Sequence, residues 1–144
     1  MKGKIIATLA LVTPLLLANP IKAANPSDVQ QLLSTGECVA CDLSGANLSG
    51  AHLIGADLRQ ANLKDANLSR SNLEGADLTG ANLQGADLTA AFVTNASFTN
   101  ANLNQVNFTQ ARIYDADVSG ASMEELNLTN AQIYNTGISV GGEE

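Results

Sequence analysis

The sequence predicts an all-β solenoid, because two observations exclude an ordinary helix or sheet. An apolar residue stands at every fifth position from Leu43 to Ile138, and a small residue stands two positions before most of them. On an α-helix of about 3.6 residues per turn, a step of five rotates by about 500° and scatters these side chains round the surface. On a flat strand, successive fifth residues alternate between the two faces. They can share one interior only if the chain turns a corner once per unit.

Twenty units follow this pattern in one register, and Ala is the small residue in fifteen of them. The other five units have Cys41, Ser71, Val106, Leu126 and Thr136 at that position. The chain has no Trp and few Phe or Tyr, which agrees with an interior built from many small, equal contributions. Because Leu126 is bulky, we expect overfilling there and a less regular C-terminal half.

The units closely resemble the pentapeptide-repeat family, whose motif is Ala, then Asp or Asn, then Leu and two further residues. The segments 46–50, 56–60 and 86–90 match it directly, and the match runs from Cys41 to about Val140. The resemblance implies a right-handed quadrilateral β-helix in which four units make one square coil. Twenty units then imply about five coils, with residues twenty positions apart stacked above one another.

The first 24 residues are predicted to be a secretory signal peptide. Lys2 and Lys4 precede an apolar run over 5–18, which is too short to span a bilayer. Export is therefore expected, to the periplasm or the thylakoid lumen if the chain is similar to the small cyanobacterial and chloroplast-lumen members of the family. After signal cleavage we expect no contact with a membrane. A retained N-terminal anchor is the alternative.

Residues 25–37 are predicted to form a capping helix over the N-terminal end of the solenoid. Asn25 is the expected N-cap, Pro26 the first helical residue and Gly36 the stop. One face carries Val29, Leu32 and Leu33, and we expect that face to lie on the first coil. Residues 38–140 then form the β-helix and 141–144 a tail.

Cys38 and Cys41 form a CVAC motif between the predicted helix and the first coil. Two cysteines and one histidine in the whole chain are too few for a zinc site, so no metal or other cofactor is expected. A thioredoxin-like centre would place the motif at a helix N-terminus instead. A structural disulfide suits an exported chain, and a reversible, regulatory disulfide is the alternative.

The twenty-residue step places two groups of residues on the predicted outer surface. Asp57, Asp77 and Asp117 share one acidic column, and solvation explains them better than metal binding. Tyr114 and Tyr134 stack in another column, with Phe92 nearby. These six residues are the candidate surface for an unknown protein partner.

Charge and composition restrict the functional classes. Residues 25–144 hold four basic and fourteen acidic residues, a formal charge of −10, so nucleic acid is not an expected ligand. Without a nucleophile–base pair or a phosphate loop, and with His52 as the single imidazole, no catalytic residue is identified and no enzyme is expected. The predicted function is a non-enzymatic, exported structural or interaction module.

Three alternatives accompany this prediction. Some members of the family act as acidic mimics of DNA that bind DNA gyrase, and the negative charge fits such a role. A redox-responsive lumenal protein that uses the CxxC motif is the second. The third concerns assembly: the sequence after Ile138 is short and polar, so either the tail folds across the C-terminal end or a second copy packs there as a homodimer.

Overall fold

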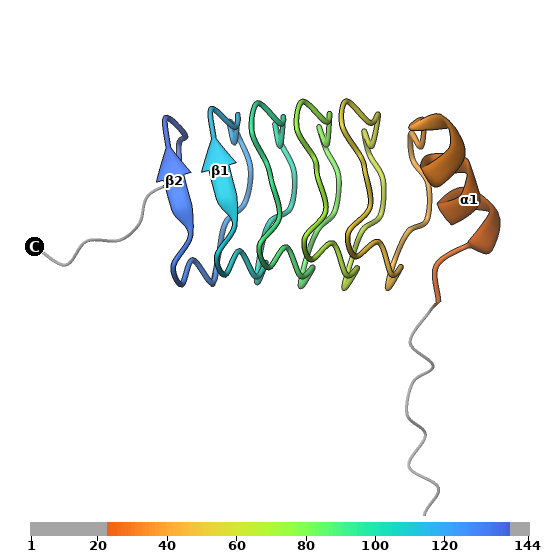
Figure 1. The fold of residues 1–144 in the computed structure, drawn as a ribbon, viewed down its shortest axis with the longest axis horizontal. Coiled ribbons are helices and arrows are strands. Elements are labelled where there is room, and N and C mark those ends of the chain that lie inside the picture. The colour runs from red at the N-terminus through yellow and green to blue at the C-terminus, as the bar shows by residue number, and fades with distance from the viewer. Residues whose placement is uncertain (1–22, 139–144) are drawn as a thin grey trace, which may run out of the picture.

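The computed structural model describes residues 23–138 (Figure 1). Within this range the chain forms one helix, α1 (Pro26–Thr35), and then a solenoid whose regular strands are β1 (Arg112–Tyr114) and β2 (Gln132–Tyr134). The predicted signal peptide lies almost wholly outside the described residues, and the predicted tail lies wholly outside them. No helix among residues 23–138 is long and apolar enough to cross a membrane.

The solenoid advances by twenty residues per turn. Parallel bridges join residues twenty positions apart, from Glu37 with Asp57 to Asn107 with Asn127, and β1 pairs with β2 at the same step. Bridges recur every five residues along the chain, so each turn has four sides. The predicted step is confirmed, whereas the predicted number of coils stays a prediction.

The interior consists of the two side chains of each unit that the sequence pattern selects. Leu-type and Ala-type residues alternate with outward polar residues and together form one continuous buried cluster. The fifth residue of a unit takes a left-handed backbone conformation that turns the corner, as at Gly75 with φ of 66°. Non-glycine residues such as Ala90, with φ of 56°, take the same conformation. Each five-residue unit therefore forms one straight side of the turn and then one corner.

Ser71 is a polar residue inside this apolar interior. It occupies an Ala-type position, is fully buried, and its hydroxyl has no hydrogen-bond partner. Because an unsatisfied buried hydroxyl carries its full desolvation penalty, we expect Ser71→Ala to raise the free energy of unfolding by about 1–3 kcal/mol. Urea unfolding measures this change. Ser69→Ala is the control, since that hydroxyl donates to Asn67 Oδ1 at 2.7 Å, and it should not stabilise the chain.

Helix α1 closes the N-terminal end of the solenoid (Figure 1). The predicted caps are confirmed: Asn25 Oδ1 accepts a hydrogen bond from Ser27 N at 3.1 Å, and Gly36 ends the helix with φ of 75°. Leu32 is buried against the interior, but Leu33 is exposed, so the prediction that Leu33 lies on the first coil is wrong. Consecutive residues of an α-helix point about 100° apart, so the face that turns Leu32 inward leaves Leu33 toward solvent.

The parallel ladder continues through the C-terminal half, but the corners there are less regular, as expected: among the described residues Leu126 N does not donate to Met123 O, and Asp117 forms no bridge with residue 137. Asn127 N donates to Val106 O at 3.0 Å, and the parallel register passes through Leu126 without interruption. Leu126 belongs to the last described turn, and it is only half-buried because no further turn packs on it. Its bulk is therefore not forced into a closed interior, and the parallel register is kept beside it.

Candidate interaction surface

One side of the solenoid carries most of its exposed apolar side chains. Along β1 the central Ile113 points inward, so Arg112 and Tyr114 point outward. The parallel register places Gln132 next to Arg112 and Tyr134 next to Tyr114. These strands thus present two adjacent outward columns to solvent.

The exposed fractions of the large apolar side chains identify the same side of the solenoid. Among the described repeat residues, 41–138, the exposed large apolar side chains are Ile54 at 61%, Phe92 at 40% and Tyr134 at 71%. All three belong to segments that stack twenty residues apart, on the side that contains β1 and β2. We call Ile54, Phe92, Arg112, Tyr114 and Tyr134 the aromatic surface.

Arg112 is the one cation of the aromatic surface. Its guanidinium carbon lies 5.2 Å from the centre of the Phe92 ring, a distance typical of a cation–π contact. Phe92 and Arg112 are bridge partners, so neighbouring turns hold the two side chains together. Sequence analysis named Phe92 but missed Arg112, although the twenty-residue step already places one above the other.

A hollow of about 450 Å³ lies beside these residues, lined by Thr94, Tyr114, Asp115 and Tyr134. Tyr114 is oriented by its hydroxyl, which donates to Gln132 Oε1 at 2.5 Å. Asp115 Oδ1 accepts a hydrogen bond from Asn135 Nδ2 at 2.6 Å. The polar groups at this hollow are therefore held in place, while the Tyr134 side chain is 71% exposed.

The acidic residues of the predicted partner surface lie on the next side of the solenoid. Asp57 and Asp77 are bridge partners, and Ser97 separates Asp77 from Asp117 in the column. The structure thus places the six predicted residues on two adjacent sides, and only Phe92, Tyr114 and Tyr134 belong to the aromatic surface.

Arg59 neutralises part of the acidic column. Its guanidinium contacts Asp57 through two bonds, Nε to Oδ1 at 2.8 Å and Nη2 to Oδ2 at 2.5 Å. Arg59 Nε also lies 3.9 Å from Asp77 Oδ2. Among residues 23–138, no group of three or more His, Cys, Asp or Glu side chains is placed to hold a metal ion. Arg59 thus places a positive charge close to two of the three carboxylates of the acidic column, which is therefore not an open anionic site.

The ion pair predicts a pH effect. The hydrogen bond from Arg59 holds the pKa of Asp57 below its ordinary value. A lowered pKa contributes stability above the unfolded-state pKa of about 4, and this contribution is lost as pH falls through the folded pKa. We expect Arg59→Gln to raise the pKa of Asp57, measured by NMR titration. The pKa of Asp117, which Arg59 does not contact, should stay unchanged in the same titration.

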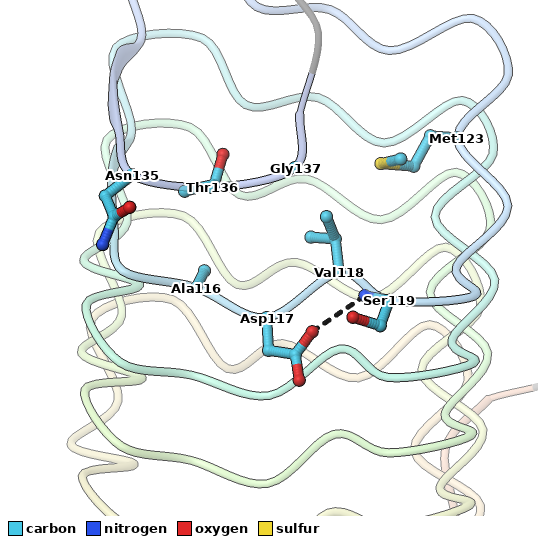
Figure 2. A pocket seen from close by; sticks show the side chains of 8 residues that line it. All are labelled: Ala116, Asp117, Val118, Ser119, Met123, Asn135, Thr136 and Gly137. Carbon is cyan, nitrogen blue, oxygen red and sulfur yellow. Dashed lines mark hydrogen bonds between the residues drawn. The ribbon is translucent and has the colours of Figure 1, made fainter.

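A second hollow, of about 460 Å³, lies near the C-terminal end of the solenoid (Figure 2). Figure 2 shows Val118 and Met123 pointing into it. At its rim, Asp117 accepts hydrogen bonds from Ser119 N at 2.9 Å and from the Thr99 hydroxyl at 3.2 Å, and the interactions with Ser119 and then Thr99 lower the pKa of Asp117. Met123 is only half-buried, so the interior is partly open at this end.

Cys38 and Cys41 form the predicted disulfide at the other end of the molecule. Both side chains are buried, and Cys38 Sγ lies 3.3 Å from the backbone oxygen of Asp28 in α1. Asp28 Oδ2 in turn accepts a hydrogen bond from Asp42 N at 2.8 Å. The disulfide thus lies at the junction between the cap and the first turn.

Comparisons with known proteins agree on the repeat. A family model described as pentapeptide repeats matches eight copies, over residues 41–80, 76–113 and 105–136. The chain is similar to the crystal structure of a pentapeptide repeat protein from the Arabidopsis thaliana thylakoid lumen, with 37% identity over 70% of this chain and 68% of that one and a TM-score of 0.63. It is also similar to a pentapeptide repeat protein from Nostoc, with 30% identity over 77% of this chain and 97% of that one and a TM-score of 0.60.

A plasmid-mediated fluoroquinolone resistance protein is a more distant match. It shares 18% identity over 69% of this chain and 59% of its own length, with a TM-score of 0.44. The comparison with curated proteins finds no match.

Proposed function

The chain belongs to the pentapeptide-repeat family, and we propose that it is an exported, non-enzymatic module that binds another protein through the aromatic surface. Membership of the family assigns it the right-handed quadrilateral β-helix. Pentapeptide-repeat proteins are in general structural modules without enzymatic activity. A role as a binding module is consistent with that general property.

One observation carries the proposal: among the described residues of the β-helix, three of the four exposed large apolar side chains lie on a single side, and Val39, at 48% exposed, lies on the next. Ile54, Phe92 and Tyr134 would each lose exposed apolar area on contact with a partner. Tyrosine and arginine are also the residue types that contribute most to protein interfaces. Solubility alone does not explain why these side chains are concentrated on one of the four sides of the solenoid.

Site-specific photo-crosslinking in the source cells tests this proposal. A photoreactive phenylalanine analogue at position 134 should yield a crosslinked product of higher mass. The same analogue at position 64 is the matched control, because Lys64 is exposed and its segment lies two sides away round the solenoid. Equal yields from the two positions, or no product from position 134, would contradict the aromatic surface as the binding site.

Export to the periplasm or the thylakoid lumen completes the proposal. It is supported by the signal-like composition of residues 1–24 and by the similar protein from the Arabidopsis thylakoid lumen. The intact mass of the native protein, with and without reduction, tests it. A chain shortened by its signal peptide that gains about 2 Da on reduction is the expected result. A full-length chain would contradict export, and partners would then be sought in the cytosol.

The redox-responsive alternative would use the Cys38–Cys41 disulfide as a switch. Burial of both cysteines favours a structural role, because a reductant reaches them only if the cap opens. We expect a reduction potential below about −300 mV and a loss of about 2 kcal/mol in the free energy of unfolding on reduction. A potential above about −250 mV would instead support the switch.

The gyrase alternative has less support. A formal charge of −10 over residues 25–144 resembles that of a DNA mimic, but the ion pair with Arg59 makes the column of Asp57 and Asp77 less negative. DNA supercoiling by gyrase, assayed with an excess of the mature protein, tests this alternative. Full activity would exclude it.

A second copy of the chain is a further candidate partner, at the C-terminal end. Met123 and Leu128 are half-buried there, whereas the corresponding residues one turn earlier are fully buried. Within the described chain, the backbone N–H groups of these two residues have no acceptor. Packing two such ends together would cover both features. A monomeric mass by light scattering at micromolar concentration would exclude the homodimer.

A further inference from the structure

We propose that Arg112 makes the aromatic surface an anion-recognition site, which docks a protein segment that presents one carboxylate beside an aromatic or aliphatic side chain. This inference rests on the proposed function and specifies the chemistry of the partner. It follows from the contacts of Arg112, from the charge around it and from the side chains that surround it.

No carboxylate among residues 23–138 forms an ion pair with Arg112. Within residues 23–138, the ion pairs of the solenoid join Arg59 to Asp57 and Asp77, and none includes Arg112. No described residue accepts a hydrogen bond from its guanidinium, whose one specific contact is the Phe92 ring at 5.2 Å. Arginine offers five N–H donors in a planar fork that matches a carboxylate. These donors remain available to a ligand.

The surroundings favour binding at this position. Phe92 lies against the guanidinium, and Tyr114 and Tyr134 lie along the adjacent column. The hydroxyl of Tyr114 is already bonded to Gln132 and does not compete for the cation. A partner that covers these rings removes water from the ion pair, which strengthens the attraction between guanidinium and carboxylate.

Because the rest of the chain is negatively charged, we expect the partner segment to present only one carboxylate where it contacts Arg112. Glu74 and Asp115 are exposed on the same side as Arg112, and residues 25–144 carry a formal charge of −10. A strongly acidic segment would be repelled by these groups. A segment with a single carboxylate flanked by apolar side chains satisfies Arg112 and also covers Phe92 and Tyr134.

A fragment titration of the mature, oxidised chain tests this inference. The probe is phenylacetate, which combines a ring with a carboxylate, and phenylacetamide is its neutral analogue. In ¹H–¹⁵N NMR spectra we expect phenylacetate to shift the signals of β1 and β2 and to bind about tenfold more tightly than phenylacetamide. Long-range repulsion by the acidic chain acts against this preference, so it must come from a local group that attracts the carboxylate.

Two variants locate the cation responsible. Arg112→Gln should abolish the preference for the acid over the amide. Lys64→Gln removes an exposed cation two sides away round the solenoid and should leave the preference intact. Equal affinities for acid and amide in the parent chain, signal shifts confined to other sides, or a preference that survives in Arg112→Gln would each overturn the inference.

The crosslinking experiment separates this inference from the proposed function. Crosslinks from position 134 without any preference for phenylacetate would retain the aromatic surface and reject the carboxylate. Absence of both results would reject both. Crosslinks whose yield falls in Arg112→Gln, together with a preference for phenylacetate, would support both.

Discussion

Replacing Phe108 by alanine is expected to lower the free energy of unfolding by about 3–5 kcal/mol. Its ring is fully buried, and the turn that contains it pairs with the turns on both sides. Phe108 N donates to Asn127 O at 2.8 Å, and Asn107 N donates to Ala86 O at 3.0 Å. These bonds hold the backbone in place, so the interior cannot collapse into the cavity. Urea unfolding followed by circular dichroism measures the loss.

Phe92→Ala is the matched control for this substitution. It deletes the same ring, but from an outward position that is 40% exposed. We expect a smaller loss than from Phe108→Ala, because part of the Phe92 ring is already in contact with water and its removal leaves no closed cavity. Equal losses from the two substitutions would contradict the assignment of Phe108 to the interior and Phe92 to the surface.

Replacing Leu32 by alanine is expected to lower the free energy of unfolding by about 2–5 kcal/mol. Leu32 is the buried residue of α1, with 1% of its surface exposed, and it packs on the interior of the first turn. Its loss weakens the cap and exposes the open N-terminal end of the solenoid. We therefore also expect increased aggregation, measured by light scattering, because an uncovered solenoid end can pair with other chains.

Leu33→Ala tests whether this effect comes from burial or from helix propensity. The neighbouring leucine lies in the same helix but is 57% exposed. Its replacement leaves helix propensity nearly unchanged, so stability should change by less than about 0.5 kcal/mol. A large loss from Leu33→Ala would instead show that α1 docks through a different face.

The candidate surface was only partly accessible to sequence analysis. The twenty-residue step placed Tyr114 and Tyr134 in one column, and the structure keeps them there. The step also relates Phe92 to Arg112, but it does not show whether a flexible arginine lies over a ring, contacts a carboxylate or extends into solvent. That choice depends on side-chain conformation, which only the contacts in the folded chain reveal.

The acidic column shows the same limit. Sequence analysis identified Asp57, Asp77 and Asp117 as neighbours along one side, and it expected solvation to explain them. It did not identify Arg59 as their partner, although Arg59 lies in the same unit as Asp57. The bidentate contact depends on how far the arginine side chain reaches across the surface.

The repeat, its inward residues and the helix that caps it were determined by the sequence itself. A five-residue apolar period admits one interior only if every unit turns a corner, and the capping signals of Asn25 and Gly36 are local. The tertiary structure alone decided the burial of Leu32 rather than Leu33, the half-open C-terminal end and the free guanidinium of Arg112. The physical reason is that these features arise between segments distant in the chain, where packing and side-chain conformation decide which groups meet.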